Sequence, residues 1–209
     1  KKMIWIREPR CMRCGKMLKD EVAEYCEDCA KRKSYITQGR SLWLHQKPVS
    51  DALYRFKYHN KRCYGSVFSE KLAEKYEKKL KEWKIGLILP IPLHWKRKRK
   101  RGYNQAKVIA DYLEGETGIP VIDDYLIRIK NTEALKELSA AERKASLEDA
   151  FLVSETSKLL YRNLRCVILV DDIYTTGSTI NECAATLKKS GVLKVYFLCA
   201  CIGKDQGGE

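Results

Sequence analysis

The chain has 209 residues, 44% of them hydrophobic, which is enough for one domain with a core and at most a small appendage. Lysine and arginine number 41 against 27 acidic residues, so the formal net charge is +14. A charge of this sign predicts a polyanionic partner, which is a nucleic acid, a phosphorylated ligand or an anionic membrane surface. The hydrophobic content excludes a disordered chain, and no apolar run reaches the roughly 18 residues that span a bilayer.

The N-terminus shows no secretion signal, because its apolar stretch from Met3 to Ile6 is far too short. The nine cysteines are an odd number for a disulfide framework, and disulfides are rare in a reducing compartment. We therefore expect a cytoplasmic protein without a membrane span.

Residues 1–35 are polar and rich in cysteine and show no helical periodicity. Cys11 and Cys14 form one C-x-x-C pair, and Cys26 and Cys29 form a second pair after eleven intervening residues. Two such pairs can bring four thiolates onto one tetrahedral ion, which predicts a structural zinc site that catalyses nothing. Two disulfides, four free thiols and an iron–sulfur cluster are the alternatives. We expect a zinc-binding module over residues 1–35 that depends on its metal to fold.

Residues 36–209 alternate apolar runs with amphipathic segments, as expected for one α/β domain. Strand-like runs cover 41–44, 85–92, 126–129, 166–170 and 194–202. Helical spacing covers 48–58, 65–83, 103–117, 140–148 and 178–190. This order predicts a mainly parallel sheet flanked by helices, with ligands bound at the carboxyl ends of its strands.

A basic segment follows the predicted strand that ends at Pro90-Ile91-Pro92. It consists of six consecutive cations: Lys96, Arg97, Lys98, Arg99, Lys100 and Arg101. We expect a loop on the ligand side of the sheet that contacts pyrophosphate, a DNA strand or both, because cations follow phosphates and the flanking Trp95 and Tyr103 can stack on bases. A solvated charged loop is the alternative. The segment Phe56-Lys57-Tyr58 is a weaker candidate for the same surface.

The segment 167–179 joins an apolar strand, two carboxylates, a hydroxyl-rich loop and a helix start. The carboxylates and the loop are Asp171, Asp172, Thr175, Thr176, Gly177, Ser178 and Thr179. Free N–H groups at a helix start attract phosphate, and Gly177 permits a close approach or a positive φ. The carboxylates can accept hydrogen bonds from ribose hydroxyls, directly or through Mg²⁺, and adjacent strand residues point to opposite faces. The order predicts a site for a phosphorylated ribose, and an ordinary capped loop is the alternative.

This segment resembles the phosphoribosyl pyrophosphate loop of type I phosphoribosyltransferases. More narrowly, the chain resembles the ComF family, which is linked to DNA uptake in natural transformation (competence). The two C-x-x-C pairs, Pro90-Ile91-Pro92 and Arg101-Gly102-Tyr103-Asn104-Gln105-Ala106 carry the narrower resemblance, which spans almost the whole chain. It implies a type I phosphoribosyltransferase-like fold and a competence helicase as a partner.

The resemblance also implies residue roles. Asp171 and Asp172 would contact the ribose hydroxyls, the segment 175–179 would surround the 5′-phosphate, and Mg²⁺ would bridge ribose and pyrophosphate. The loop after Pro90-Ile91-Pro92 would face the pyrophosphate. The segment 128–143 matches the family's mobile region. Two of its matching positions are Thr132 and Arg143, whereas Leu135 and Ser146 replace the Gln and Asn that relatives usually carry.

Two functions follow from these features. The first is a DNA-uptake protein that binds phosphoribosyl pyrophosphate with Mg²⁺ and single-stranded DNA. The second is an active phosphoribosyltransferase with an unidentified acceptor, for which Asp171, Asp172 and Arg143 are the candidate catalytic residues. Only seven residues follow Ile202, so we expect no C-terminal hood over an acceptor base, and an acceptor site would have to come from residues 1–60. This expectation favours binding over catalysis.

Overall fold

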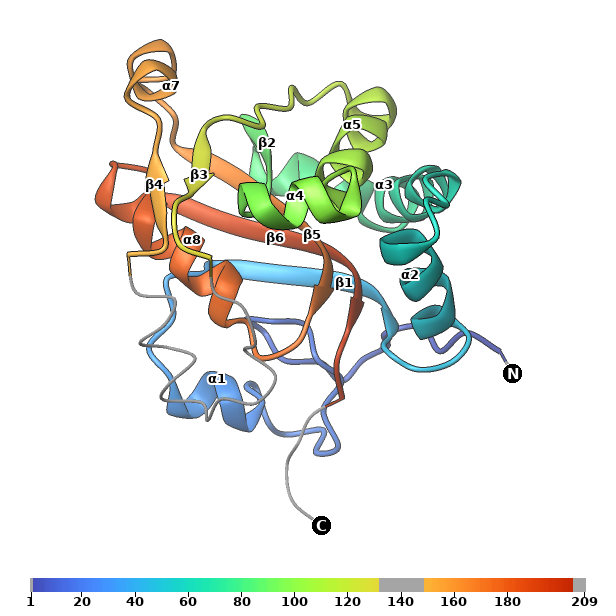
Figure 1. Ribbon diagram of the computed structural model, residues 1–209. Coiled ribbons are helices and arrows are strands. Elements are labelled where there is room, and N and C mark those ends of the chain that lie inside the picture. The colour runs from blue at the N-terminus through green and yellow to red at the C-terminus, as the bar shows by residue number, and fades with distance from the viewer. Residues whose placement is uncertain (1, 132–148, 205–209) are drawn as a thin grey trace.

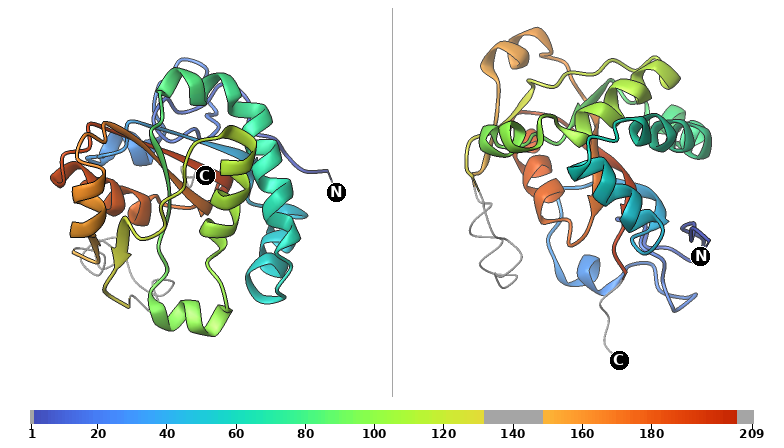
Figure 2. Two further views of the ribbon diagram at one scale, coloured as in Figure 1. Left: turned by 90° about the horizontal axis from the view of Figure 1, so that it is seen from above. Right: turned by 45° about the vertical axis from the view of Figure 1, so that its right-hand side comes forward.

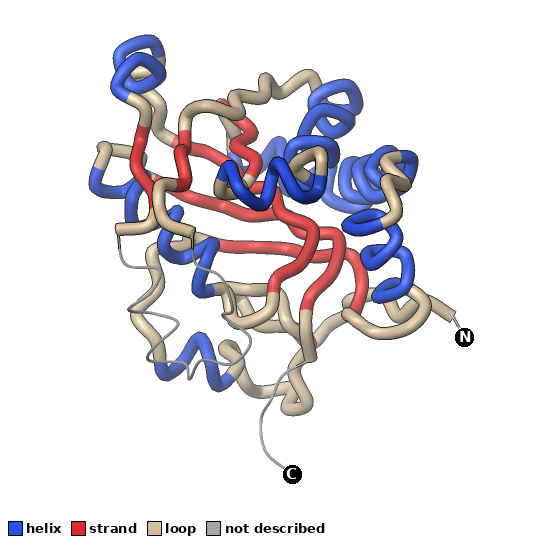
Figure 3. The backbone as a smooth tube through the Cα atoms, viewed as in Figure 1, coloured by secondary structure: helices blue, strands red, loops and turns tan. Residues whose placement is uncertain are grey.

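The centre of the structure is a four-stranded sheet in which neighbouring strands are parallel. The computed structural model describes residues 2–131 and 149–204. In sheet order, the strands are β1 (Gln38–Leu44), β6 (Lys194–Ile202), β5 (Cys166–Tyr174) and β2 (Leu87–Pro90). Figures 1 and 3 show these strands running through the middle of the molecule. The sheet confirms the predicted mainly parallel α/β architecture.

Other elements cover both faces of this sheet (Figure 2, left). One face packs against α2 (Val49–Tyr58), α3 (Cys63–Trp83) and α5 (Gln105–Thr117). The other packs against α8 (Ser178–Lys189) and an antiparallel pair of strands, β3 (Leu126–Arg128) and β4 (Phe151–Val153). The short helices of the described residues are α1 (Glu27–Lys31), α4 (Trp95–Arg101) and α7 (Glu155–Leu160).

The central strand β5 explains the two-sided packing. Its first apolar residues alternate between the two cores, with Val167 and Leu169 on the α8 side and Ile168 and Val170 on the α3 side. All four are fully buried. A continuous apolar run of this kind is typical of a parallel strand that is covered on both faces. The sequence pattern therefore fixes β5 at the centre of the fold.

The basic segment 96–101 lies in helix α4, so the predicted loop is wrong. At the start of this helix, the backbone N–H of Lys96 donates to the Nδ1 atom of His94 over 3.3 Å. At its end, Gly102 adopts a left-handed conformation with a φ of +80°. Lysine and arginine are good helix formers, and the caps at both ends favour the helix further. These local preferences outweigh the repulsion between adjacent cations.

The remaining predicted elements mostly agree with the structure. The predicted helices at 48–58, 65–83, 103–117 and 178–190 correspond to α2, α3, α5 and α8, and the last predicted strand corresponds to β6. The elements α1, β4 and α7 were not predicted, because five, three and six residues are too few for a clear periodic pattern. The predicted helix at 140–148 lies outside the described residues.

The N-terminal segment lies against β1 before it reaches the cysteines. Backbone hydrogen bonds of 2.9 Å join Ile6 to Leu42 and Leu44 to Ile4, and the Trp5 and Trp43 rings lie 5.0 Å apart. Among the described residues, no helix has both the length and the apolar character that crossing a bilayer requires.

Candidate functional site

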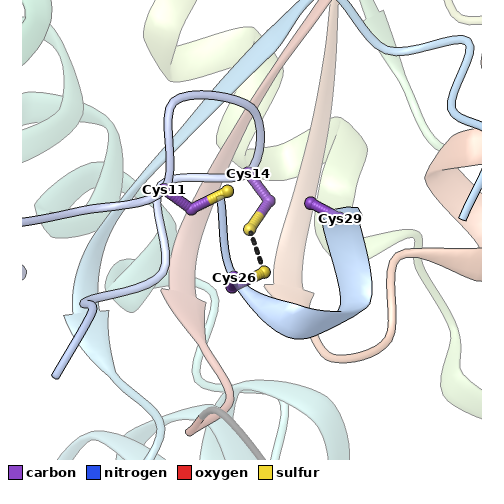
Figure 4. Close-up of side chains that lie close together, drawn as sticks. All are labelled: Cys11, Cys14, Cys26 and Cys29. Atoms are coloured by element: carbon purple, nitrogen blue, oxygen red, sulfur yellow. Dashed lines mark hydrogen bonds between the residues drawn. The ribbon is translucent and has the colours of Figure 1, made fainter. Parts of the chain in front are cut away.

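The four cysteines of the two C-x-x-C pairs come together in the structure (Figure 4). Their sulfur atoms lie within 4.8 Å of one another, and the Cys14 and Cys26 sulfurs are 3.6 Å apart. A zinc ion bound to four thiolates at about 2.3 Å would place the sulfurs about 3.8 Å apart. All nine cysteines of the chain are free in this structure, so the two-disulfide alternative finds no support. The cluster can therefore hold a metal ion.

Local structure explains how this cluster forms. Gly15 follows the first pair with a φ of +76°, and its N–H donates to the Cys11 carbonyl over 2.9 Å, which closes a tight turn. The second pair brackets the start of α1, with Cys26 as the N-cap residue. Lys16 is almost completely buried and pairs with Asp28 at 2.7 Å, which ties the two halves together.

Asp171 and Asp172 lie within β5 rather than after it, which corrects the predicted end of this strand. The pairing of β5 with β6 continues from Asp171 opposite Cys199 to Tyr174 opposite Ile202. The strand continues because Ile173 and Tyr174 are favourable strand residues beyond the two carboxylates. Both carboxylates are therefore held on a paired strand.

Asp172 is paired with a lysine from α2. The residue is only 4% exposed, and its Oδ2 atom lies 2.6 Å from the Nζ atom of Lys57. Burial lowers the pKa of Lys57, but the attraction of the Asp172 and Asp171 carboxylates outweighs it and raises the pKa above its usual value. Lys57 therefore stays charged at neutral pH. The sequence suggested this residue for an outer DNA surface, whereas the structure places it against Asp172.

Asp171 has a different environment. Its Oδ1 atom accepts the backbone N–H of Asp172 over 2.8 Å, and the residue is partly exposed. Burial of the carboxyl group, followed by repulsion from Asp172, raises the pKa of Asp171 to about 7, while Lys57 acts in the opposite direction. The two carboxylates thus have different partners, because Asp172 pairs with Lys57 whereas Asp171 accepts a backbone N–H.

The loop after β5 ends at the start of α8, where the N-cap residue is Gly177. Gly177 has a φ of +75°, and a Cβ atom there would lie 2.1 Å from the Tyr174 hydroxyl oxygen. Thr176 Oγ1 and Ser178 Oγ are 3.0 Å apart. Among the described residues, no side chain caps the start of α8, so its first N–H groups can meet an anion.

The loop after β5 and the connection to α4 follow two neighbouring strands of the sheet. β2 and β5 are parallel neighbours, with Pro90 opposite Val170, so both end at the same edge. The helix after β5 lies on one face, whereas α5, which follows β2 and α4, lies on the other. In parallel sheets, ligands bind where neighbouring connections diverge in this way. By this rule a ligand is expected at the ends of β2 and β5, and the carboxylates, the segment 175–179 and α4 belong to these ends or follow them in the chain.

Helix α4 divides its cations into two groups. Arg97 and Arg101, one turn apart, are partly buried toward the molecule. The other four are exposed: Lys96, Lys98, Arg99 and Lys100. Burial and then the charge of Arg97 lower the pKa of the buried Arg128 in β3, while Asp171 acts in the opposite direction. Lys57 of α2 thus pairs with Asp172, Arg128 of β3 interacts with Asp171, and Arg97 of α4 acts on Arg128.

Not every predicted residue takes part in this arrangement. Tyr103 is only 6% exposed and its hydroxyl donates to the Phe56 carbonyl, so it offers no ring to a base at the surface. Trp95 remains 60% exposed, as a stacking ring requires. The predicted positions Thr132, Leu135, Arg143 and Ser146 lie outside the described residues.

A separate hollow of about 600 Å³ lies between α3 and α5. Its walls include Leu80, Ile85 and Ile119 together with the exposed Glu74 and Glu77. It shares no residue with the carboxylates, the segment 175–179 or α4, so it is distinct from the candidate ligand site.

These features define an α/β protein with a type I phosphoribosyltransferase-like sheet and a four-cysteine cluster. No family model matches the chain. "Competence protein F" of Haemophilus influenzae is 32% identical over 191 residues, which are 90% of this chain and 82% of that protein. "Competence protein ComFC" of Bacillus subtilis is 27% identical over 87% of this chain and 72% of its own. "DNA utilization protein YhgH" of Salmonella typhi is 28% identical over 84% of this chain and 77% of its own. The chain belongs to the ComF family.

Proposed function

We propose that this protein acts in DNA uptake, where it binds phosphoribosyl pyrophosphate and single-stranded DNA at one edge of its sheet. The observation that supports the proposal is that the two carboxylates on β5, the uncapped start of α8 and the basic helix α4 all belong to the parallel neighbours β5 and β2 or follow them in the chain. The names of the relatives, which refer to competence and to DNA utilization, support the process. A competence helicase is the partner that the family resemblance suggests.

Each part of the site has a role in this proposal. Asp171 and Asp172 accept hydrogen bonds from the two vicinal ribose hydroxyls. The backbone N–H groups and hydroxyls of the segment 175–179 surround the 5′-phosphate, with Gly177 giving the close approach. The inner cations of α4 face the pyrophosphate. Mg²⁺, for which carboxylate oxygens are suitable ligands, would neutralise part of the ligand's charge.

Calorimetry with phosphoribosyl pyrophosphate tests this assignment. Hydrogen bonds to charged groups contribute about 1.5–3 kcal/mol each, so Asp171→Ala combined with Asp172→Ala should weaken binding about a hundredfold or more. The control is Glu70→Ala combined with Glu74→Ala, which removes two exposed acids on α3 and should bind like the wild type. If the aspartate variant and the control bind with equal affinity, Asp171 and Asp172 do not form the binding site for phosphoribosyl pyrophosphate.

The DNA surface combines exposed cations with exposed aromatic rings. The four outer cations of α4 are accompanied by Trp95, which is 60% exposed. On α2, Tyr54 and Tyr58 are 58% and 56% exposed, and their rings lie 5.0 Å apart. Cations that follow a phosphate backbone beside rings that stack on bases are typical of a surface for single-stranded nucleic acid.

A titration with an oligothymidylate at several salt concentrations tests the DNA surface. Changing Lys96, Lys98, Arg99 and Lys100 to Gln should weaken binding and reduce its salt dependence, by about 0.7 in the log–log slope per lost phosphate contact. Tyr54→Ala should weaken binding by about 1–3 kcal/mol if a base stacks there, with the slope unchanged. A charge variant with the wild-type slope would place DNA elsewhere.

The four-cysteine cluster is proposed to hold zinc as the structural centre of a module over residues 1–35. Four buried thiolates from two pairs are the ligand set that structural zinc prefers. Four free thiols also suit a reducing compartment, so we propose a cytoplasmic location. Elemental analysis of purified protein should give about one zinc per chain, and iron or no metal at all would contradict the zinc assignment.

An active phosphoribosyltransferase remains the alternative to a binding protein. In that case the cations near the carboxylates would stabilise the departing pyrophosphate. The test is release of pyrophosphate from phosphoribosyl pyrophosphate, with candidate acceptor bases and with and without DNA. Turnover that disappears in the Asp171→Ala, Asp172→Ala variant would favour the enzyme.

A further inference from the structure

The last turn of α2 contacts three separate parts of the molecule through three consecutive residues. The Phe56 carbonyl accepts the hydroxyl of Tyr103, which lies just after α4. Lys57 forms its 2.6 Å ion pair with Asp172 on β5. The Tyr58 ring lies beneath Arg101, the last residue of α4, with 5.4 Å between the guanidinium carbon and the ring centre.

The Lys57–Asp172 pair is shielded from water. The Lys57 side chain is 20% exposed and that of Asp172 is 6% exposed. Removing one partner from such a pair leaves the other charge buried without compensation, so the pair strongly favours one position of the α2 end. The ion pair therefore fixes the distance between α2 and the candidate ribose site.

The neighbouring residue continues this connection to the surface. Tyr58 is 56% exposed, and Arg101 above it also donates from Nη1 to Gln105 Oε1 over 3.1 Å. A cation over an aromatic ring at this distance is attractive, so the position of the α4 end depends on the position of Tyr58. A base or phosphate that engages this surface would restrain the same turn that carries Lys57.

We propose that Lys57 is a positioning residue that couples the candidate ribose site to the basic surface of α4, so that phosphoribosyl pyrophosphate and single-stranded DNA strengthen each other's binding. This inference rests on the proposed function, because it requires both ligands. A strand held on Tyr58 and α4 fixes the end of α2, and Lys57 then holds Asp172 in the orientation that accepts the ribose hydroxyl. Linkage makes the effect reciprocal for the two ligands.

Calorimetry of phosphoribosyl pyrophosphate with and without saturating oligothymidylate measures this coupling in the wild-type protein. We expect binding to be about fivefold tighter with the oligonucleotide at physiological salt, where repulsion between ligands beyond about 8 Å is screened. Absence of phosphoribosyl pyrophosphate binding to the wild type would overturn the proposed function and this inference together. Two ligands that bind independently or antagonistically would overturn the coupling alone.

Variants of Lys57 separate positioning from folding. Lys57→Met should lose the coupling and bind phosphoribosyl pyrophosphate more weakly, and Lys57→Arg should restore both. Lys61→Met removes the same charge from an exposed residue beyond the end of α2 and should behave like the wild type. If Lys57→Met does not fold, the coupling measured in the wild type and in Lys57→Arg still tests the proposal, which requires both proteins to show it. Undiminished coupling in Lys57→Met would overturn the proposal.

The pH dependence gives a readout that a purely structural role would not change. The charged groups that act on Asp171 are Asp172 on its own strand, Lys57 on α2 and Arg128 on β3, and buried thiols lie near it on β6 and α8. Affinity for phosphoribosyl pyrophosphate should rise with pH as Asp171 loses its proton, because the carboxylate is the form proposed to accept the ribose hydroxyl. Lys57 lowers the pKa of Asp171, so the loss of Lys57 should move this rise to higher pH. Equal weakening of Lys57→Met at every pH would contradict positioning.

Discussion

The four cysteines and the two aspartates are arranged on opposite principles, although the cysteines share a core cluster with residues of the same strand that carries the aspartates. The four sulfur atoms lie within 4.8 Å of one another in a buried cluster, as four ligands of one ion must. The aspartates are adjacent but unequal, because Asp172 is paired with Lys57 whereas the pKa of Asp171 is raised to about 7. The four equivalent thiols can fill all the coordination positions of one metal ion. The two aspartates have different surroundings and can therefore contact different groups of one ligand.

This difference predicts opposite effects on stability and binding. A thiol of the cysteine cluster supports folding, so its loss should lower the unfolding free energy. In the proposed ligand site, by contrast, a carboxylate held beside a like charge costs stability in return for binding, which is the usual compromise at a functional site. Removing Asp171 should therefore stabilise the protein and weaken its binding of phosphoribosyl pyrophosphate.

The largest effect is expected from the cysteine cluster. Cys26→Ser should lower the unfolding free energy by several kcal/mol, because the zinc proposed for this cluster would contribute its binding free energy to folding. Thermal unfolding measures the change, and a chelator should reproduce it in the wild type. Cys63→Ser changes an exposed cysteine outside the cluster and should leave the midpoint unchanged. Equal midpoints for the two variants would show that the cluster does not stabilise the protein.

The second prediction concerns pH. The pKa of Asp171 is about 7 in the folded chain and about 3.9 in the unfolded chain, so its stabilising contribution is complete below pH 4 and lost as the pH rises through 7. At 1.36 kcal/mol per pKa unit, the loss is at most about 4 kcal/mol. Urea unfolding at pH 5 to 8 should show a fall in wild-type stability that is smaller in Asp171→Asn. Parallel curves for the two proteins would contradict the raised pKa.

The local parts of the candidate site could be recognised because their residues are neighbours in the sequence. The C-x-x-C pairs and the segment 171–179 are local patterns, and each lies on one element or turn. Lys57 and Asp172 come from distant parts of the chain, and only the fold brings them together. One signal was present, because Val49, Leu53 and Lys57 follow helical spacing and the first two are buried. A lysine in line with the buried apolar residues of a helix indicates that its charge is paired with a buried acidic group.

The basic segment 96–101 is the opposite case. Its residues favour a helix, but six consecutive charges suggested a loop. Gly102 is a typical residue at the end of a helix, and the lysines and arginines before it favour helix, whereas the cap by His94 is seen only in the structure. The helix then divides six equivalent-looking cations into an inner pair and four outer ones. That division depends on which face of α4 packs against the rest of the protein, and amino-acid composition does not determine this face.

The third prediction concerns the backbone of the loop. Gly177→Ala should lower the unfolding free energy by about 1–2 kcal/mol for the left-handed conformation alone, and the clash with Tyr174 adds to this. The substitution should also displace the backbone N–H groups that would contact the 5′-phosphate. A loss of about 1.4 kcal/mol in binding free energy would weaken the binding of phosphoribosyl pyrophosphate about tenfold, and we expect at least this effect. Calorimetry and urea unfolding measure the two effects.

Gly115→Ala is the matched control for Gly177→Ala. Gly115 lies in α5, and a Cβ atom there would meet no neighbouring element within 4 Å, so alanine fits and should raise stability by up to about 1 kcal/mol. Its affinity for phosphoribosyl pyrophosphate should equal that of the wild type. The loop assignment fails if the two glycine variants bind this ligand equally well.

The smallest effect is expected from a single outer cation. Lys98→Gln should reduce the log–log salt slope of oligothymidylate binding by about 0.7, which corresponds to one phosphate contact. Lys194→Gln removes the same charge from the exposed start of β6, and the carboxyl ends of the strands lie at the opposite edge of the sheet. A smaller slope for Lys98→Gln alone would locate the strand beside α4. Equal slopes for the two variants would mean that net charge attracts DNA without a defined path, and the carboxylate site would then be independent of the DNA surface.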